Sequence, residues 1–330
     1  MLKSRIPRVR RWEYIMCVLE SARQNETLKE IEMRLVKTKI DFERKKSLAI
    51  GRGKTRKKGL NTAKVLVQDS KLMAATLGLI KENEKLQLTN IGKAMLNLDI
   101  QSKESLDIIL PRLFSRYLPI VELFRSLLMA DSNEIMLPQR RNILEFRKVA
   151  EKQNLFIGQM DFVIARNLLG QLGIINWFLV DKGDNRYSHV YLSSIVKEER
   201  NLVPEDADFT LIEYSNKKIT IQRKKVCLSE FSKTLWKEYL KMARGIPLKP
   251  VFYSSLRDNV CCKTRISDIE FDHHMSTLLE NHCSENYHLF GSGGTIPFSH
   301  FSSSVLKSLP LKFSDGRYIT YIKMEEIHKE

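Results

Sequence analysis

Two stretches of the chain share one pattern, and this pattern constrains the fold more than any other feature of the sequence. Residues 77–80 read LGLI and residues 172–175 read LGII, and each stretch separates a helix-periodic segment from two short strand-like runs. A glycine lets a helix end tightly, and the aliphatic pair after it can begin a strand. Each stretch therefore predicts a helix followed directly by a small hairpin.

The segment before the first of these stretches contains further helix signals. Apolar periodicity predicts a helix from Trp12 to Arg23. A second helix is predicted from Thr27, where TLKE has the spacing of a capping box, and a third from Asn61, which can cap a helix that ends at Gly78. The order is helix, helix, helix and then a hairpin with a charged tip.

This order, together with the segment LGLIKENEKLQLTNIGKAML (residues 77–96), resembles the winged helix-turn-helix superfamily of DNA-binding domains. The resemblance covers roughly residues 10–98 and identifies no specific family. It implies a recognition helix over residues 60–78. The side chains that this helix presents to base edges or phosphates are Asn61, Lys64, Gln68 and Lys71.

The rest of the chain is predicted to be mostly helical. Residues 103–130 are apolar and contain Pro111 and Pro119, which predicts two or more short helices, and residues 138–153 predict another helix with Pro138 at its start. The second glycine stretch predicts a second winged-helix-like unit. The last third contains two strand-like runs in 210–223, a long helix from 228 to 243, and a helix–turn–helix over 251–282 in which Ser267 caps the second helix.

We therefore expect a mainly α fold with small β-hairpin wings, built from tandem winged-helix units around a helical middle. The expected parts are a basic arm plus winged helix (1–100), a helical linker block (101–137), a second winged-helix-like unit (138–203) and an α+β C-terminal unit (204–330). Two interpretations of the last part stay open: a third winged helix with GSGG in its wing, or an unrelated α+β unit.

The charge of the chain is concentrated at one end. The 330 residues carry a net charge of +16, and residues 1–64 hold 19 Lys or Arg against 7 Asp or Glu, a net of +12. Such an excess favours a polyanionic partner. Because the asymmetry is so strong, it indicates a binding arm or face. The alternative is a protein whose positive charge serves only its solubility.

Two basic segments are the strongest candidates for phosphate contact. Four arginines form an N-terminal arm, and five cations are interleaved with glycines in the sequence AIGRGKTRKKGL. These are Arg5, Arg8, Arg10 and Arg11 in the arm, and Arg52, Lys54, Arg56, Lys57 and Lys58 in the loop. Flexible loops of this kind suit phosphate contact without base reading. A solvated charged loop is the alternative.

The motif GRGKT in this loop does not predict a nucleotide-binding P-loop. That motif requires a glycine at position 48, where Leu48 stands, and a buried strand before it, where a charged helix is predicted. The sequence does not match a nuclease core of the type Asp…Glu-x-Lys either, because Ser215 stands two residues after Glu213, where that motif requires lysine.

The other candidate sites have simpler explanations. The acids between Asp268 and Asp272 fit the first turn of a helix, and GSGG fits a hinge or wing tip. The Cys and His residues between 261 and 288 contain no C-x-x-C pair of the kind that zinc sites show. We therefore expect no catalytic residue, no cofactor and no metal site, and a protein that is not an enzyme. An enzyme whose site one sequence does not reveal is a further alternative.

The expected function is DNA binding by the first unit, with the C-terminal units available for a protein partner or a homodimer. RNA in place of DNA stays open. The alternative is an adaptor or structural subunit of a DNA-processing, chromosome-organising or phage-defence complex, in which the winged helices mainly bind protein. Five sparse cysteines and the lack of a signal peptide or apolar span predict a cytoplasmic protein, or a nuclear one in a eukaryote, with no membrane partner.

Overall fold

The fold was obtained as a computed structural model. It describes residues 7, 9, 11–27, 29–38, 61–82, 86–139, 143–182, 185–198, 209–280, 287–292 and 319–326. The described residues form helices and small antiparallel sheets, as the expected fold class requires at this coarse level.

The N-terminal elements follow the order that the sequence predicts. They are α1 (Trp12–Arg23), a helix over residues 29–38, α3 (Asn61–Thr76), β1 (Ile80–Glu82), β2 (Leu86–Leu88) and α4 (Asn90–Met95). The strands β1 and β2 pair antiparallel, with Ile80 opposite Leu88. The predicted limits of the first helix, the start of the third helix and the hairpin are therefore confirmed.

The central elements are helices and the strands of two three-stranded sheets. They are α5 (Lys103–Arg116), α6 (Leu118–Met129), β3 (Glu134–Pro138), α7 (Ile143–Lys152), α8 (Gln159–Gln171), β4 (Ile175–Lys182), β5 (Asn185–Leu192), β6 (Ser194–Glu198), β7 (Thr210–Tyr214) and β8 (Lys217–Arg223). The first sheet has the order β3-β5-β4 and the second the order β6-β8-β7, with all neighbours antiparallel.

The C-terminal elements form a third group. They are α9 (Leu228–Ala243), β9 (Val251–Phe252), α10 (Tyr253–Thr264), α11 (Asp268–Glu280), β10 (Tyr287–Ser292) and β11 (Tyr321–Glu326). Their sheet has the order β10-β11-β9. From α6 to β5 and from α9 to β11 the same order recurs: helix, strand, two helices and two strands, with the last strand in the middle of the sheet.

Two of the sequence-based expectations are wrong about proline. Pro138 does not begin a helix, because it ends β3, an edge strand in which Pro138 lies opposite Tyr187. An edge position tolerates proline since only one side of the strand needs donors. Pro111 does not interrupt a helix either, because α5 continues through it. The division into two helices that the sequence predicts occurs at Tyr117, between the end of α5 and the start of α6, which has Pro119 in its first turn.

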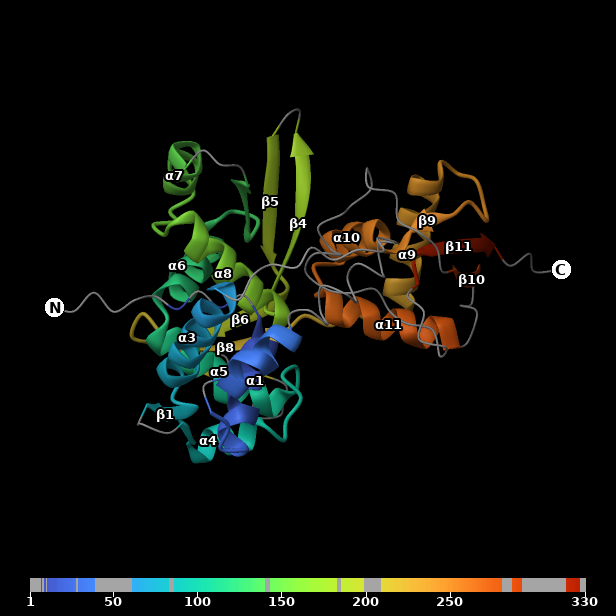
Figure 1. Cartoon of the computed structure of the whole chain (residues 1–330). Coiled ribbons are helices and arrows are strands. Elements are labelled where there is room, and N and C mark those ends of the chain that lie inside the picture. Colours follow the sequence, from blue (N-terminus) through green and yellow to red (C-terminus); the bar gives the residue numbers. More distant parts are fainter. Residues whose placement is uncertain are drawn as a thin grey trace.

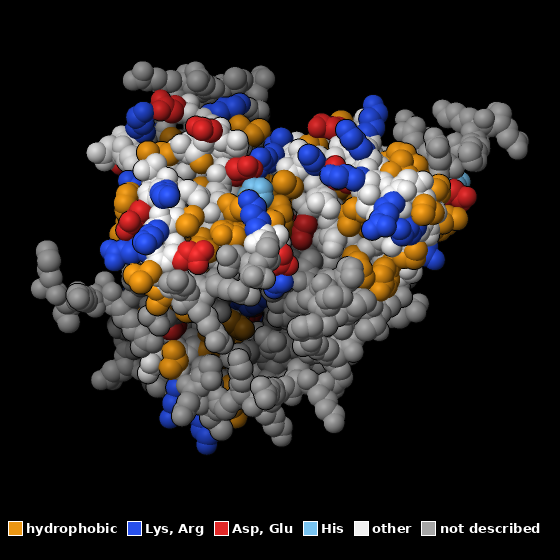
Figure 2. Space-filling model, turned by 90° about the horizontal axis from the view of Figure 1, so that it is seen from above, with side chains coloured by type: hydrophobic (Ala, Val, Ile, Leu, Met, Phe, Trp, Pro, Cys, Tyr) orange, Lys and Arg blue, Asp and Glu red, His pale blue; other side chains and the backbone are white. Residues whose placement is uncertain are grey.

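The core is divided into two apolar clusters. One extends from Val9 to Ile221 and the other from Phe231 to Met324. They correspond to two lobes of the molecule, with α1 to β8 in one lobe and α9 to β11 in the other (Figure 1). Seen from above, Lys, Arg, Asp and Glu side chains are mixed over the first lobe (Figure 2).

The two glycine stretches have the same local structure. Gly78 and Gly173 have φ of 69° and 71°, in the left-handed region that favours glycine. After each, the next residue donates its N–H five residues back, to the carbonyl of Ala74 at 2.9 Å and of Leu169 at 3.1 Å. This is the Schellman arrangement, and it explains why both helices end where the sequence predicts.

A hydroxyl group after each hairpin donates a hydrogen bond to the carbonyl of the helix-ending glycine. Thr89 Oγ1 donates to the carbonyl of Gly78 at 2.8 Å, and Ser193 Oγ donates to that of Gly173 at 3.0 Å. The backbone N–H of each residue donates to the carbonyl that follows the glycine, at 3.1 Å in both cases. The end of the helix and the end of the hairpin are thus joined in the same way in both units.

Gly92 follows Thr89 in the first unit and lies directly against β1. A Cβ atom on Gly92 would be 2.0 Å from the carbonyl oxygen of Leu79. We expect Gly92→Ala to lower the free energy of unfolding by about 3 kcal/mol, because backbone atoms must move to admit the methyl group. Urea unfolding checks this.

Gly158→Ala is the matched control for this substitution. Its Cβ would lie 3.4 Å from Asp161 Oδ2, an ordinary contact, so we expect a loss below about 1 kcal/mol. Equal losses for Gly92→Ala and Gly158→Ala would contradict the packing that is described around Gly92.

Candidate nucleic-acid interface

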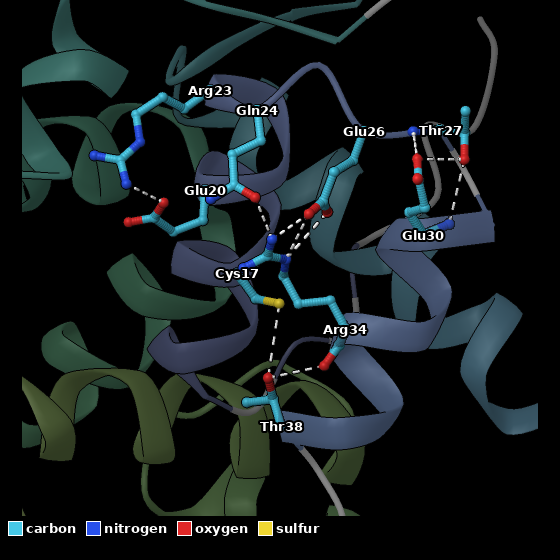
Figure 3. Close-up of polar contacts among 9 residues, drawn as sticks. All are labelled: Cys17, Glu20, Arg23, Gln24, Glu26, Thr27, Glu30, Arg34 and Thr38. Atoms are coloured by element: carbon cyan, nitrogen blue, oxygen red, sulfur yellow. Dashed lines mark hydrogen bonds and ion pairs between the residues drawn. The ribbon is translucent and has the colours of Figure 1, made fainter.

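The first unit is held together by a polar network that fixes its second helix against α1. Arg34 Nε donates to both carboxylate oxygens of Glu26, at 3.1 and 3.0 Å, and its Nη2 also donates to Gln24 (Figure 3). At the other side, the hydroxyl of Thr38 donates to the carbonyl of Arg34 at 3.0 Å. Arg34 therefore has a structural role in this unit.

The predicted capping box at Thr27 is confirmed. The N–H and the hydroxyl of Thr27 both donate to Glu30 Oε2 at 2.7 Å, and the N–H of Glu30 lies 3.4 Å from Thr27 Oγ1 (Figure 3). The bonds from Thr27 lower the pKa of Glu30, and the hydrogen bond from Arg34 lowers the pKa of Glu26. Both carboxylates are thus kept charged in the folded unit.

The shift of Glu26 predicts how this unit responds to acid. A lowered pKa in the folded state adds stability above the unfolded value, near 4.5, and this stability is lost as the pH falls through the folded value. We expect Glu26→Gln to cost about 1 kcal/mol at pH 7 and less at pH 3.5, as measured by urea unfolding at both pH values.

Glu20→Gln serves as the control, since its partner Arg23 is 53% exposed and such surface pairs contribute about 0.3 kcal/mol. If Glu26→Gln lowered the free energy of unfolding by the same amount at pH 7 and at pH 3.5, the result would contradict the lowered pKa of Glu26.

Helix α3 presents the predicted polar face to solvent. Lys64 and Gln68 are exposed and Lys71 is half-buried, whereas Val67 and Met73 on other sides of the helix are buried. The first turn of α3 contains no acidic side chain. No acid of the first turn therefore offsets the positive end of the helix dipole, which favours an anion there.

The other predicted contact residues are described only in part. Asn61 lies in α3, but its side chain is outside the described part, as are Arg5, Arg8, Arg10 and the five loop cations between Arg52 and Lys58. Arg11 is described: its side chain is 13% exposed and its Nη1 lies 3.5 Å from Glu13 Oε1. The segment that carries the loop cations begins after Thr38 and ends at Asn61, the first residue of α3.

The helices that directly precede the last two strands of the central and C-terminal groups, as α3 precedes β1 and β2, have different surroundings. In the central group this helix is α8, which has Asp161 in its first turn and is covered by α1 near its end. The indole Nε1 of Trp12 donates to the carbonyl of Leu168 at 3.2 Å, and the N–H of Trp12 donates to Gln171 at 3.0 Å. In the C-terminal group it is α11, with Asp268 and Glu270 in its first turn.

The acids at the start of α11 surround a buried cation that the sequence did not reveal. Arg257 is fully buried, and its Nη1 donates to Asp272 at 3.0 Å, while Asp268 lies 3.8 Å from its Nε. The hydroxyl of Tyr253 also donates to Asp272, at 2.6 Å. These acids therefore have an ion-pairing role in addition to the favourable position at the helix start, where Ser267 caps α11 as predicted.

The two lobes meet at a second ionic cluster. His189 Nε2 lies 3.2 Å from Glu134 Oε2, and Arg265 of the C-terminal lobe binds the same carboxylate. Burial lowers the pKa of His189. Close by, Asn176 Nδ2 donates to the carbonyl of Ile266 at 3.1 Å and to Asp268 at 3.0 Å. The polar side chains at this boundary are engaged in joining the lobes.

A cavity of about 390 Å³ lies beside this cluster, between α6, β3 and the end of α7. Its lining includes Glu134, His189 and Gln153. The amide of Gln153 is bonded at both ends to the backbone of Met136, so this side chain is occupied by the fold.

The cysteines and histidines of the C-terminal lobe have ordinary partners where they are described. Cys261 is buried and donates to the carbonyl of Ser267, and His274 lies 3.0 Å from the carbonyl of Val226. Within the described ranges, no group of three or more Cys, His, Asp or Glu side chains is placed to hold a metal ion. None of the described helices has the length and apolarity that a membrane span requires.

The chain is similar to a solved structure of a known protein. It is the restriction endonuclease FokI, with 12% sequence identity and a TM-score of 0.32, covering 86% of this chain and 60% of FokI. No family model matches the chain, and no curated protein matches it. This chain thus spans about 60% of the length of the protein that it matches.

The comparison corrects one expectation. FokI is an enzyme, which goes against the prediction that this chain is not one, and we do not keep that prediction. The withdrawal assigns nothing in its place, because at a TM-score of 0.32 the likeness gives this chain neither a fold nor an activity.

Proposed function

We propose that this protein binds duplex nucleic acid through its first unit, with DNA as the expected duplex. The observation that carries the proposal is the contrast among the three corresponding helices. Only α3 of these three combines an acid-free first turn with outward Lys64 and Gln68, whereas α8 and α11 begin with acids. A phosphate backbone is attracted to the first arrangement and repelled by the other two.

The charge of the chain supports the same assignment. Of the net charge of +12 in residues 1–64, residues 1–11 contribute +5 and residues 39–60, which precede α3, contribute +7, whereas the helix over residues 29–38 contributes only +1. Cations near the N-terminus of α3 add to the field of its dipole. Phosphate contacts from these segments can supply affinity, while Asn61, Lys64, Gln68 and Lys71 can meet base edges or phosphates.

In this proposal the first unit is a winged helix, with α3 as its recognition helix and β1–β2 as its wing. The recurring order of helix, strand, two helices and two strands supports winged-helix units in the central and C-terminal groups as well. The shared Gly–hydroxyl closure at Gly78 and Gly173 supports a common plan for the first two units. The repeated order starts at α6 and α9, so the proposed units begin at these helices.

A protein partner is the second candidate function, and one feature of the central group favours it. Ile143 and Leu144 at the start of α7 are each 70% exposed, and Phe156 is 63% exposed. Exposed large apolar side chains are typical of protein contacts. In this alternative the central unit docks onto a protein and nucleic-acid contact is secondary.

Binding of the full chain to labelled probes of one length and random sequence tests the proposal. Fluorescence anisotropy compares duplex DNA, duplex RNA and single-stranded DNA at the same salt concentration. We expect duplex DNA to bind with a Kd on the order of 1 μM or tighter at 0.1 M salt. No binding to either duplex, or equal binding to the single strand, would contradict the assignment to duplex recognition.

A further inference from the structure

Helix α9 of the C-terminal lobe carries a row of exposed lysines. Lys233, Lys237 and Lys241 are all exposed and are four residues apart, and Arg244 follows at the end of the helix. Residues four apart lie on one face of a helix, separated by about 6 Å along its axis. The three ammonium groups therefore form one row of roughly 12 Å.

The charges of this row are only weakly compensated. Lys241 is 73% exposed and lies 3.9 Å from Glu238, a long separation for an ion pair. Within the described part of the chain, no ion pair involves Lys233 or Lys237. The row is thus open to an external anion.

Four acids of the same lobe face inward, which the sequence could not reveal. Asp258 and Glu238 are buried, and Asp268 and Asp272 lie against the buried Arg257. In residues 224–280 the exposed charged side chains are six cations and two acids: Lys225, Lys233, Lys237, Lys241, Arg244 and Lys263 against Glu230 and Glu280. Lys and Arg side chains accordingly predominate on the upper face of the right-hand lobe (Figure 2).

We propose that the row on α9 is a second phosphate-contact surface, which extends the nucleic-acid footprint from the first unit onto the C-terminal lobe. The proposal rests on the proposed function. Lysine suits this role because its flexible, point-like charge meets phosphates without reading bases. The C-terminal lobe thus uses its first helix, α9, because α11, which corresponds to α3, begins with acids.

Lysine acetylation of the full chain, with and without a random 30-base-pair DNA duplex, tests the surface directly. Mass spectrometry gives the modified fraction of each lysine. We expect the duplex to lower acetylation of Lys233, Lys237 and Lys241 at least threefold. Lys148 on α7 and Lys197 on β6, both exposed, are the internal controls and should react equally in both samples.

The same experiment separates failure of this proposal from failure of the proposed function. Protection of Lys64 with unchanged acetylation on α9 overturns the second surface and leaves the first unit as the site. Protection on α9 alone supports the second surface and contradicts the first. Equal labelling everywhere overturns both. Poly-L-glutamate is the competing probe: if it protects α9 and the duplex does not, the surface binds acidic protein and the proposal is wrong.

A variant gives an independent readout. Changing Lys233, Lys237 and Lys241 together to Gln should lower the slope of log K against log salt by roughly 2 to 3, since each phosphate contact contributes about 0.9. The control changes Lys148, Lys152 and Lys197 to Gln, which removes the same charge from other exposed positions. An equal slope for the two variants would overturn the proposal.

Discussion

Changing Arg52, Lys54, Arg56, Lys57 and Lys58 together to Ser is expected to weaken binding to duplex DNA of any sequence about a hundredfold at 0.1 M salt. The reason is electrostatic, because each cation lost removes a phosphate contact and the counterion release that accompanies it. The slope of log K against log salt should fall by about 4. Anisotropy titrations on two unrelated duplex sequences measure both quantities.

Urea unfolding of the variant separates a loss of binding from a loss of folding. These five residues lie outside the described part of the chain, in the segment between Thr38 and Asn61, so their substitution removes no described core contact. The control changes five exposed lysines elsewhere to Ser, namely Lys148, Lys152, Lys182, Lys197 and Lys217. If the loop variant retains the affinity of the wild type, or loses no more than the control, the loop is a solvated segment.

The second large effect is expected at Arg257. Burial raises the pKa of Asp272, and the charge of Arg257 together with the Tyr253 hydroxyl counteracts this shift. Arg257→Met leaves Asp272 without its cation, which typically costs about 3 to 5 kcal/mol. Because protonation can neutralise the remaining acid, the deficit should be smaller at pH 5 than at pH 7.5.

Hydrogen exchange locates this effect as well as measuring it. Amides of α10 and α11 should lose protection, whereas those of α5, in the other apolar cluster, should keep theirs. The double variant Arg257→Met, Asp272→Leu removes both charges and should recover most of the loss. A single variant as stable as the wild type, or a double variant that is no better than the single one, would contradict the ion pair.

The sequence predicted the local structure well where a short motif carries its own physical cause. The capping box at Thr27 and the helix-ending glycines Gly78 and Gly173 depend on residues within a few positions, so they can be recognised without knowing the fold. The hairpins after both glycines follow from the same local signals. These features account for most of the element order.

The wrong expectations concern features that only tertiary contacts determine. Proline at position 138 predicts a helix start because proline is common there, but an edge strand also accepts proline, and pairing with β5 decides the outcome. Arg34 and Arg257 have partners that no spacing rule identifies. The inward orientation of Asp268 and Asp272 likewise depends on Arg257, which lies on a different helix.

The candidate interface was predictable as a set of residues but only in part as a surface. The exposure of Lys64 and Gln68 follows from the periodicity of α3. The contrast with α8 and α11 required the structure, since the observed starts of these helices decide which acids lie in their first turns. The lysine row on α9 also required the structure, because the exposure of its three side chains is known only from the fold.

The salt dependence of duplex binding by the full chain tests the central claim most directly. The measurement is the association constant for a random 30-base-pair DNA duplex between 50 and 300 mM monovalent salt. Recognition through the basic arm, the loop and α3 predicts a linear decrease of log K against log salt with a slope of about −5 or steeper. A flat dependence, or no binding at the lowest salt, would contradict the account.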